Sequence, residues 1–128
     1  MRHKKNKLLE ISTWDKKKSI FTRQLLTNLI RSGKVVTTSK RAKILKSDAD
    51  SFFARLIKIM KNNDKKGARR ECIRYIKSKI YGEVEWKKVI DKLLPKYIEN
   101  WNKSSFVSDY KVWFRKWDGA EKIMVKLN

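Results

Sequence analysis

The sequence contains one cysteine, one histidine, one proline and four glycines in 128 residues. Cys72 therefore has no partner for an internal disulfide, which is typical of a reducing compartment. One cysteine and one histidine do not supply the usual zinc ligand set. The few glycines form neither a P-loop nor a dinucleotide-binding pattern. We expect no metal, no cofactor and no small-molecule substrate.

Long apolar runs are missing as well. No stretch approaches the roughly 20 apolar residues that cross a bilayer. Residues 1–12 lack the hydrophobic core of a signal peptide. His3 lies in a cationic segment without the orienting partner that a general base needs. The sequence thus predicts neither a membrane protein nor an enzyme.

Acidic residues are scarce: 13 Asp and Glu stand against 34 Lys and Arg, a formal net charge of +21. Such a charge repels itself unless a polyanion neutralises it. Nucleic acid is favoured, because binding to phosphates releases condensed counterions. An anionic membrane surface fits less well, since the charge is spread along the chain. Residues 1–46 hold 14 of the cations and only 2 of the acids, so they are the expected binding surface.

The apolar spacing predicts an α+β fold of about four helices with a small C-terminal antiparallel sheet. We expect a basic N-terminal extension at residues 1–12 and a single α+β domain at residues 13–128. A first helix begins at about Thr13 or Asp15, either of which can cap it, and Gly33 ends it. Residues 34–38 favour a short strand that can join the sheet.

Three further helices follow. Ser39 is expected to cap the second, and Asp64 the third, which stops near Gly82. The fourth runs from about Glu83 until Pro95 disrupts it.

A hairpin is predicted at the end of the chain, because apolar residues alternate on both sides of an Asp118-Gly119 turn. In the first strand, Val112 and Phe114 are expected to point inward and Trp113 outward. Trp101, Trp113 and Trp117 fit either base stacking or packing on the helices. Trp117, beside Arg115 and Lys116, is the tryptophan expected to touch a base or ribose.

Two acidic pairs, Asp48/Asp50 and Glu83/Glu85, raise the question of a metal site. Helical side chains two positions apart point to different faces, which argues against it. Glu83 and Glu85 instead suit the start of a helix, where the dipole favours negative charge.

Four cationic patches, at residues 2–5, 15–18, 39–43 and 65–70, carry the binding prediction. A single patch would indicate a solvated helix face. Four of them, with the overall charge, favour RNA phosphates. The predicted RNA-binding residues are Arg2, His3, Lys4, Lys5, Lys7, Lys16, Lys17, Lys18, Arg23, Thr37, Thr38, Ser39, Lys40, Arg41, Lys43, Lys65, Lys66, Arg69, Arg70, Arg115, Lys116 and Trp117.

The corner at residues 37–43 is the best candidate on mechanism. Backbone N–H groups at a helix start bind anions, and three hydroxyl side chains add neutral donors. Cations beside a helix N-terminus oppose the helix dipole, and a bound phosphate would resolve that conflict. Ser39 can serve as a cap, as a ligand, or as both. No recognition-helix, zinc-finger or aromatic-sheet signature appears, so the pattern suits one folded RNA recognised by shape.

These stretches also carry a family resemblance. The opening "MRHKK", the segments "FTRQLLTNLI" and "GKVVTTSKRAKILK", and the later "ARRECIRYI" and "VIDKLLPKY" resemble the bacterial large-subunit ribosomal protein seventeen family. The resemblance implies an α+β domain whose basic N-terminal extension enters large-subunit ribosomal RNA near the polypeptide exit. It implies ribosomal RNA and neighbouring large-subunit proteins as partners, and no intrinsic homo-oligomer. The implied location is the ribosome in a bacterial cytoplasm, with an organellar ribosome left open.

Two alternatives stand beside this interpretation. One is a free nucleic-acid-binding protein, such as a nucleoid protein or an RNA chaperone, which would bind arbitrary duplexes with a steep salt dependence. The other is a magnesium-dependent nuclease, which would lose cleavage in Asp48→Ala or Asp50→Ala.

Overall fold

The computed structural model describes residues 14–99 and 105–128. The expected extension at residues 1–12, with Arg2, His3, Lys4, Lys5 and Lys7, lies outside the described residues, as does Trp101. None of the helices within the described part has the length and apolar character of a membrane span.

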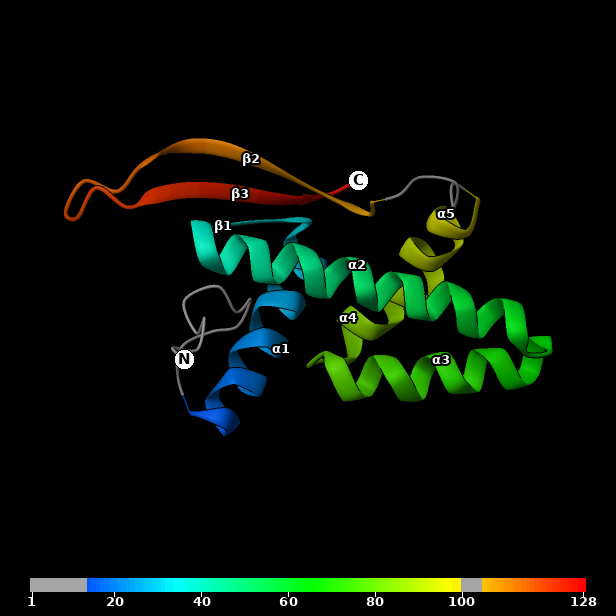
Figure 1. The fold of residues 1–128 in the computed structure, drawn as a ribbon. Coiled ribbons are helices and arrows are strands. Elements are labelled where there is room, and N and C mark those ends of the chain that lie inside the picture. Colours follow the sequence, from blue (N-terminus) through cyan, green and yellow to red (C-terminus); the bar gives the residue numbers. More distant parts are fainter. Residues whose placement is uncertain (1–13, 100–104) are drawn as a thin grey trace, which may run out of the picture.

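The elements follow the order that the apolar spacing predicts. The helices are α1 (Asp15–Ser32), α2 (Ser39–Asn62), α3 (Lys65–Lys79) and a continuous stretch made of α4 (Glu83–Lys88), the π-helical η2 (Val89–Leu93) and α5 (Leu94–Glu99). The strands are β1 (Lys34–Thr38), β2 (Val107–Phe114) and β3 (Glu121–Leu127). The expected α+β class is confirmed: the helices lie on one side of a three-stranded antiparallel sheet (Figure 1).

One predicted helix end and one predicted helix start are confirmed, and two other starts are corrected. Gly33 ends α1 in the left-handed region (φ 78°), and the Asp64 carboxylate caps α3 by accepting from the Gly67 N–H at 3.3 Å. Trp14, not Thr13 or Asp15, takes the cap position of α1 and makes no side-chain cap bond. Ser39 is the first residue of α2 rather than its cap, because the strand before it extends through Thr38.

The fourth helix does not stop at Pro95, as expected, but continues to Glu99. The chain widens into a π turn just before the proline, and the Leu94 N–H reaches back five residues to the Val89 carbonyl. A proline ring has no N–H and crowds the carbonyl four residues earlier, so a regular α-helix is disfavoured at this point. A π turn is another local distortion of a helix, and here it directly precedes the proline. Leu94 and Tyr97 are buried on either side of Pro95, so packing keeps the stretch helical.

The sheet has the strand order β1-β3-β2. β3 therefore lies in the centre and pairs with both neighbours, antiparallel in each case. Its Ile123 and Val125 are buried against the helices, as their alternation predicts, and α2 runs beneath the inner face (Figure 1). The strand expected at residues 34–38 does join the sheet.

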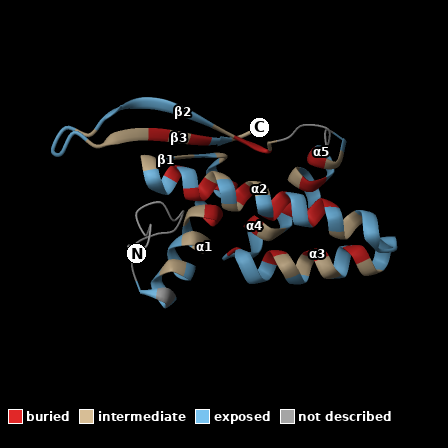
Figure 2. Cartoon of the chain, viewed as in Figure 1, coloured by how far each residue is buried: buried red, intermediate tan, exposed pale blue. Residues whose placement is uncertain are grey.

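The hairpin differs from the prediction in two respects. Its connection is a longer loop from Arg115 to Ala120, closed by a bond from the Arg115 N–H to the Ala120 carbonyl at 2.8 Å, rather than a two-residue turn. β2 also has a bulge, because its register against β3 shifts between Lys111 and Trp113. Val112 and Phe114, expected inside, are about half exposed, since the outer half of β2 runs beyond the helices (Figure 2).

The core is centred on α2. Phe52 and Phe53 are fully buried, and an aromatic cluster joins Phe53 to Tyr97 and Phe106, with ring centroids 4.8 and 5.9 Å away. α1, α2, α3, η2, α5, β2 and β3 contribute buried residues to one hydrophobic cluster, and β1 and α4 pack against it through the partly buried Val35 and Trp86. Burial raises the pKa of Tyr97 to about 12, and its hydroxyl donates to the Asn128 carbonyl at 3.1 Å.

Candidate nucleic-acid interface

The corner where β1 enters α2 has free anion-binding capacity. Thr38 holds the cap position in an extended conformation (φ −74°, ψ 162°), but its side chain makes no cap hydrogen bond. The first turn of α2 contains no acidic residue. The first N–H groups of a helix have no intrahelical partner and carry the positive end of the dipole. The corner is therefore suited to an external anion.

The cationic side chains predicted to bind RNA at this corner are exposed to solvent. Lys40, Arg41 and Lys43 are exposed, while Thr37, Thr38 and Ser39 are half-buried around the helix start. Ala42 between them is buried in the core and fixes the orientation of the turn.

The second turn of α1 lies close to the same corner. The Arg41 guanidinium sits 5.6 Å from the ring centroid of Phe21, which connects the second turn of α1 with the first turn of α2. Lys16 and Lys17, exposed on the first turn of α1, extend the basic surface from there. Two of the predicted patches, at residues 15–18 and 39–43, thus belong to one end of the molecule.

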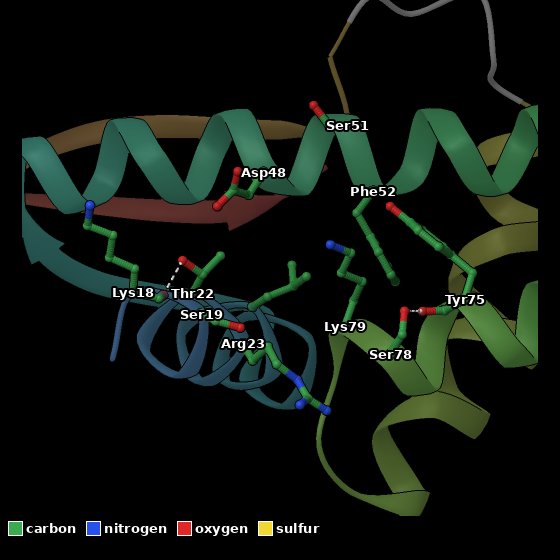
Figure 3. Close-up of a pocket in the computed structure, with 11 residues that line it drawn as sticks. Lys18, Ser19, Thr22, Arg23, Asp48, Ser51, Phe52, Tyr75, Ser78 and Lys79 are labelled. Carbon is green, nitrogen blue, oxygen red and sulfur yellow. Dashed lines mark hydrogen bonds between the residues drawn. The ribbon is translucent and has the colours of Figure 1, made fainter. Parts of the chain in front are cut away.

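A cleft of about 370 Å³ opens between α1, α2 and α3 (Figure 3). Lys18, Arg23 and Lys79 line it together with Asp48. Burial raises the pKa of Asp48, and the nearby Lys79 opposes that rise. Because the cleft contains a carboxylate among its cations, it is less suited to phosphate than the acid-free corner.

Arg23 is largely engaged within the fold. Its guanidinium stacks 4.0 Å from the ring centroid of Tyr81 and donates to the Lys77 carbonyl at 3.4 Å. Its buried Nε finds no acceptor within the described residues. Arg23 therefore faces the side of the cleft rather than open solvent.

The patch at residues 65–70 lies at the opposite end of the molecule. α2 spans 24 residues between the corner and this patch, which at 1.5 Å per residue is about 36 Å. Lys65, Lys66 and Arg70 are exposed, and Arg69 lies 3.5 Å from Asp91. The Asp64 cap already meets the positive end of the α3 dipole, so the argument from an uncompensated dipole holds for α2 and not for α3.

The hairpin loop places Arg115, Lys116 and Trp117 together. The Arg115 Nε donates to Asp118 Oδ1 at 3.0 Å, and the guanidinium stacks 5.4 Å from the Trp117 ring centroid. The Ala120 N–H, and then Arg115, hold the pKa of Asp118 below its ordinary value. Trp117 is 78% exposed, so packing on the helices does not explain it.

The acidic pairs have structural partners. Asp50 accepts from the Phe106 N–H at 2.9 Å, whereas Asp48 turns into the cleft. Glu83 pairs with Lys87, and Glu85 with Arg31, at the start of α4 as predicted. In the described part of the chain, His, Cys, Asp and Glu side chains form no group of three that could hold a metal ion.

Sequence reasoning missed one part of the surface, the outer face of the sheet. Lys34, Lys122 and Lys126 share that face with Tyr110 and Trp113. The period-two alternation of β1 and β3 predicts which of their side chains share a face of the sheet. Which residues of the three strands lie next to one another depends on the pairing of β1 with β3 and on the bulge in β2, which the sequence does not show.

Comparison with known proteins gives a consistent result. A family model described as Ribosomal protein L17 matches residues 21–128. The chain is similar to the Large ribosomal subunit protein bL17 of Desulforamulus reducens, at 33% identity over 105 residues, 82% of this chain and 84% of that protein. The bL17 of Halothermothrix orenii is 34% identical over 111 residues, 87% of each chain. The bL17 of Clostridium tetani is 33% identical over 105 residues, 82% of this chain and 83% of that protein.

Proposed function

Because this chain belongs to the ribosomal protein L17 family, we propose that it is a structural component of the large ribosomal subunit that binds ribosomal RNA through phosphate contacts. The proposed partners are large-subunit ribosomal RNA and the neighbouring large-subunit proteins. No catalytic step, cofactor or small-molecule substrate is part of the proposal. The ribosome of a bacterial cytoplasm is the proposed location, near the polypeptide exit, in keeping with the family resemblance.

The observation that carries the proposal is the corner between β1 and α2. Its helix start has no side-chain cap and no acid in its first turn, yet Lys40, Arg41 and Lys43 surround it. Cations here destabilise an isolated helix by a few tenths to about 1 kcal/mol through the dipole. A phosphate placed against the N–H groups compensates both the dipole and the cations.

The basic regions are proposed to contact different RNA segments. The corner and the start of α1 would bind one RNA segment, and residues 65–70, about 36 Å away along α2, would contact a second segment. The shared hydrophobic core supports one domain over residues 13–128, with residues 1–12 as an extension into the RNA.

Sedimentation and salt dependence test the proposal together. Tagged protein should co-sediment with the large subunit and leave it only at high salt. In binding to purified large-subunit RNA, K40A/K43A should reduce the slope of log K against log salt by about 1 for each lost phosphate contact.

The matched control is K58A/K92A, which removes two exposed lysines outside the proposed corner. It lowers the net charge by the same amount and should leave the slope closer to that of the unaltered protein. Equal slopes for the two double variants would reject the corner as the site. Recovery of the unaltered protein only in the soluble pool, or equal binding to any duplex, would reject the ribosomal role.

A further inference from the structure

The outer face of the sheet, away from α2, forms a regular array of side chains. Side chains alternate between the two faces along each strand, and the register aligns them across strands. One cross-strand row contains Val36, Met124 and Tyr110. The row on one side of it contains Lys34, Lys126 and Ser108, and the row on the other contains Thr38, Lys122 and Trp113.

The bulge in β2 determines which aromatic rings share this face. Without it, Val112 and Phe114 would follow Tyr110 on the outer side. The register shift after Lys111 instead sets Trp113 opposite Lys122 and Phe114 opposite Glu121. Tyr110 and Trp113 therefore lie on the same face, opposite β3 residues that are two positions apart, which is roughly 7 Å along the strand.

This face is open within the described part of the chain. Val36 is 52% exposed, Tyr110 51% and Trp113 73%. The helices that carry the core all lie on the other side of the sheet (Figure 1). The Tyr110 and Trp113 rings are therefore accessible to a ligand, and the Trp113 ring has one edge contact, with Phe114, at 6.3 Å between ring centroids.

The charges on this face have a single sign. Its three rows contain three lysines and no carboxylate. The two acids of these strands point the other way: Asp109 pairs with Lys46 of α2 at 3.1 Å, and Glu121 pairs with Lys111 at 3.4 Å. A ligand for the face must therefore combine negative charge with flat apolar surface.

We propose that the outer face of the sheet is a stacking platform for unpaired bases of single-stranded RNA, with Tyr110 and Trp113 as the stacking rings and Lys34, Lys122 and Lys126 as phosphate contacts. Unpaired nucleotides supply both a phosphate and an exposed base. Duplex RNA keeps its base faces stacked inside the helix. A protein partner fits less well, because lysine is depleted in protein–protein interfaces.

This inference rests on the proposed ribosomal function but concerns a different surface from the corner at residues 37–43. It assigns that surface to unpaired nucleotides. The corner, by contrast, requires only phosphates.

Fluorescence anisotropy with two RNA probes tests the platform: a labelled 12-nucleotide oligoadenylate and a labelled duplex of the same length. The full chain should bind both. The double variant Y110A/W113A should lose affinity for the single strand by about tenfold per ring, and its affinity for the duplex should change little. The salt slope should stay constant, since no phosphate contact is removed.

Two further variants make the result decisive. Y110L/W113L keeps apolar side chains but has no ring faces, so it should lose single-strand affinity much as the alanine pair does. Phe114→Ala removes a similarly exposed ring that pairs with Glu121 outside the three rows but lies in edge contact with Trp113, with ring centroids 6.3 Å apart, so it should reduce that affinity far less than the double variant does. Far-ultraviolet circular dichroism confirms that each variant is folded.

The outcomes separate the two proposals. Unaltered single-strand affinity in Y110A/W113A, or recovery in Y110L/W113L, would overturn the stacking platform and leave the ribosomal role standing. Normal RNA binding by Y110A/W113A with loss from large subunits would indicate a protein neighbour and also overturn it. Failure of the unaltered chain to co-sediment with large subunits would overturn the proposed function instead.

Discussion

Arg31 Nε lies 2.7 Å from Glu85 Oε1, in an ion pair that joins the end of α1 to the start of α4. Nearby, the Lys88 ammonium donates to the Ile30 carbonyl at 2.7 Å, where α1 has carbonyls without helical partners. The Arg31 bond is the main reason why the pKa of Glu85 lies below its ordinary value. Two helices whose paired residues lie 54 positions apart in the chain are thus fixed to each other by charge as well as by packing.

The first prediction concerns pH. A carboxyl whose pKa is lower in the folded protein stabilises it fully above the unfolded value, which is 4.5 here, and loses that effect as pH falls through the lower folded value. Glu85→Gln should therefore flatten the fall in urea midpoint between neutral and acidic pH. Glu99→Gln, which alters an exposed carboxylate at the end of α5, should leave the fall unchanged. Parallel curves for Glu85→Gln and the unaltered protein would contradict the prediction.

Gly82 gives a second prediction. Its φ of 91° with ψ 145° is a conformation almost restricted to glycine. A Cβ there would also lie 2.1 Å from Glu85 Oε2, in a carboxylate that Arg31 holds in place. Gly33 also has positive φ, but its Cβ would meet no atom within 4 Å. We expect Gly33→Ala to lower the free energy of unfolding by about 1–2 kcal/mol and Gly82→Ala by more, measured in urea. Equal losses would show that the carboxylate moves freely.

Asp50 supports the third prediction. Its carboxylate accepts from the Phe106 N–H at 2.9 Å and the Ser105 hydroxyl at 3.2 Å, which fixes the start of β2 to α2. Asp50→Ala leaves the Phe106 N–H without its acceptor, although the Ser105 hydroxyl can still donate to the Val107 carbonyl at 2.7 Å. The loss should lower the free energy of unfolding by about 1–3 kcal/mol. Asp50→Asn, which keeps one oxygen, should lower it less.

Asp109→Ala is the matched control for Asp50→Ala, since it breaks only the exposed contact with Lys46. It should cost at most about 1 kcal/mol. If Asp50→Ala is no more destabilising than this control, the contact does not fix the hairpin. A loss of magnesium-dependent RNA cleavage in Asp50→Ala would instead favour the nuclease alternative.

Cys72 supplies the fourth prediction. Its side chain has no exposed area and packs between α3 and α2, with Sγ 3.8 Å from the Leu56 carbonyl. Burial raises the pKa of the thiol, so its reactive thiolate form is scarce. The reaction with a disulfide reagent should be slow in native buffer and fast in urea. Reaction in native buffer at the urea rate would show that α3 separates readily from α2.

The helices were largely predictable because their signals are local. Apolar spacing of three and four residues identified α2, the left-handed Gly33 ended α1, and Asp64 capped α3. The failures arose where distant residues decide the local structure. Ser39 lost its expected cap position because Thr38 pairs with Lys122, 84 positions along the chain (122 − 38). Pro95 stayed helical because Leu94 and Tyr97 are buried.

The candidate site was predictable in composition but not in arrangement. The residues of the corner could be identified because a helix start and cations are visible in the sequence. The distance between this corner and residues 65–70 depends on the unbroken length of α2. The alternation of Tyr110, Val112 and Phe114 resembles a core-facing strand, yet it cannot reveal that the helices end short of the hairpin. The bulge depends on β3 and is invisible in β2 alone.

The strand order has a consequence for the solubility of the free protein. With β3 in the centre, β2 is an outer strand of eight residues that has backbone donors and acceptors on its open side. A regular strand of this kind is a template on which a second molecule can add by edge pairing and start a fibril. The extra residue at the bulge interrupts that template, and Lys111 adds charge to it. Deleting Val112 would restore an uninterrupted template and favour aggregation before the chain reaches its assembly partner.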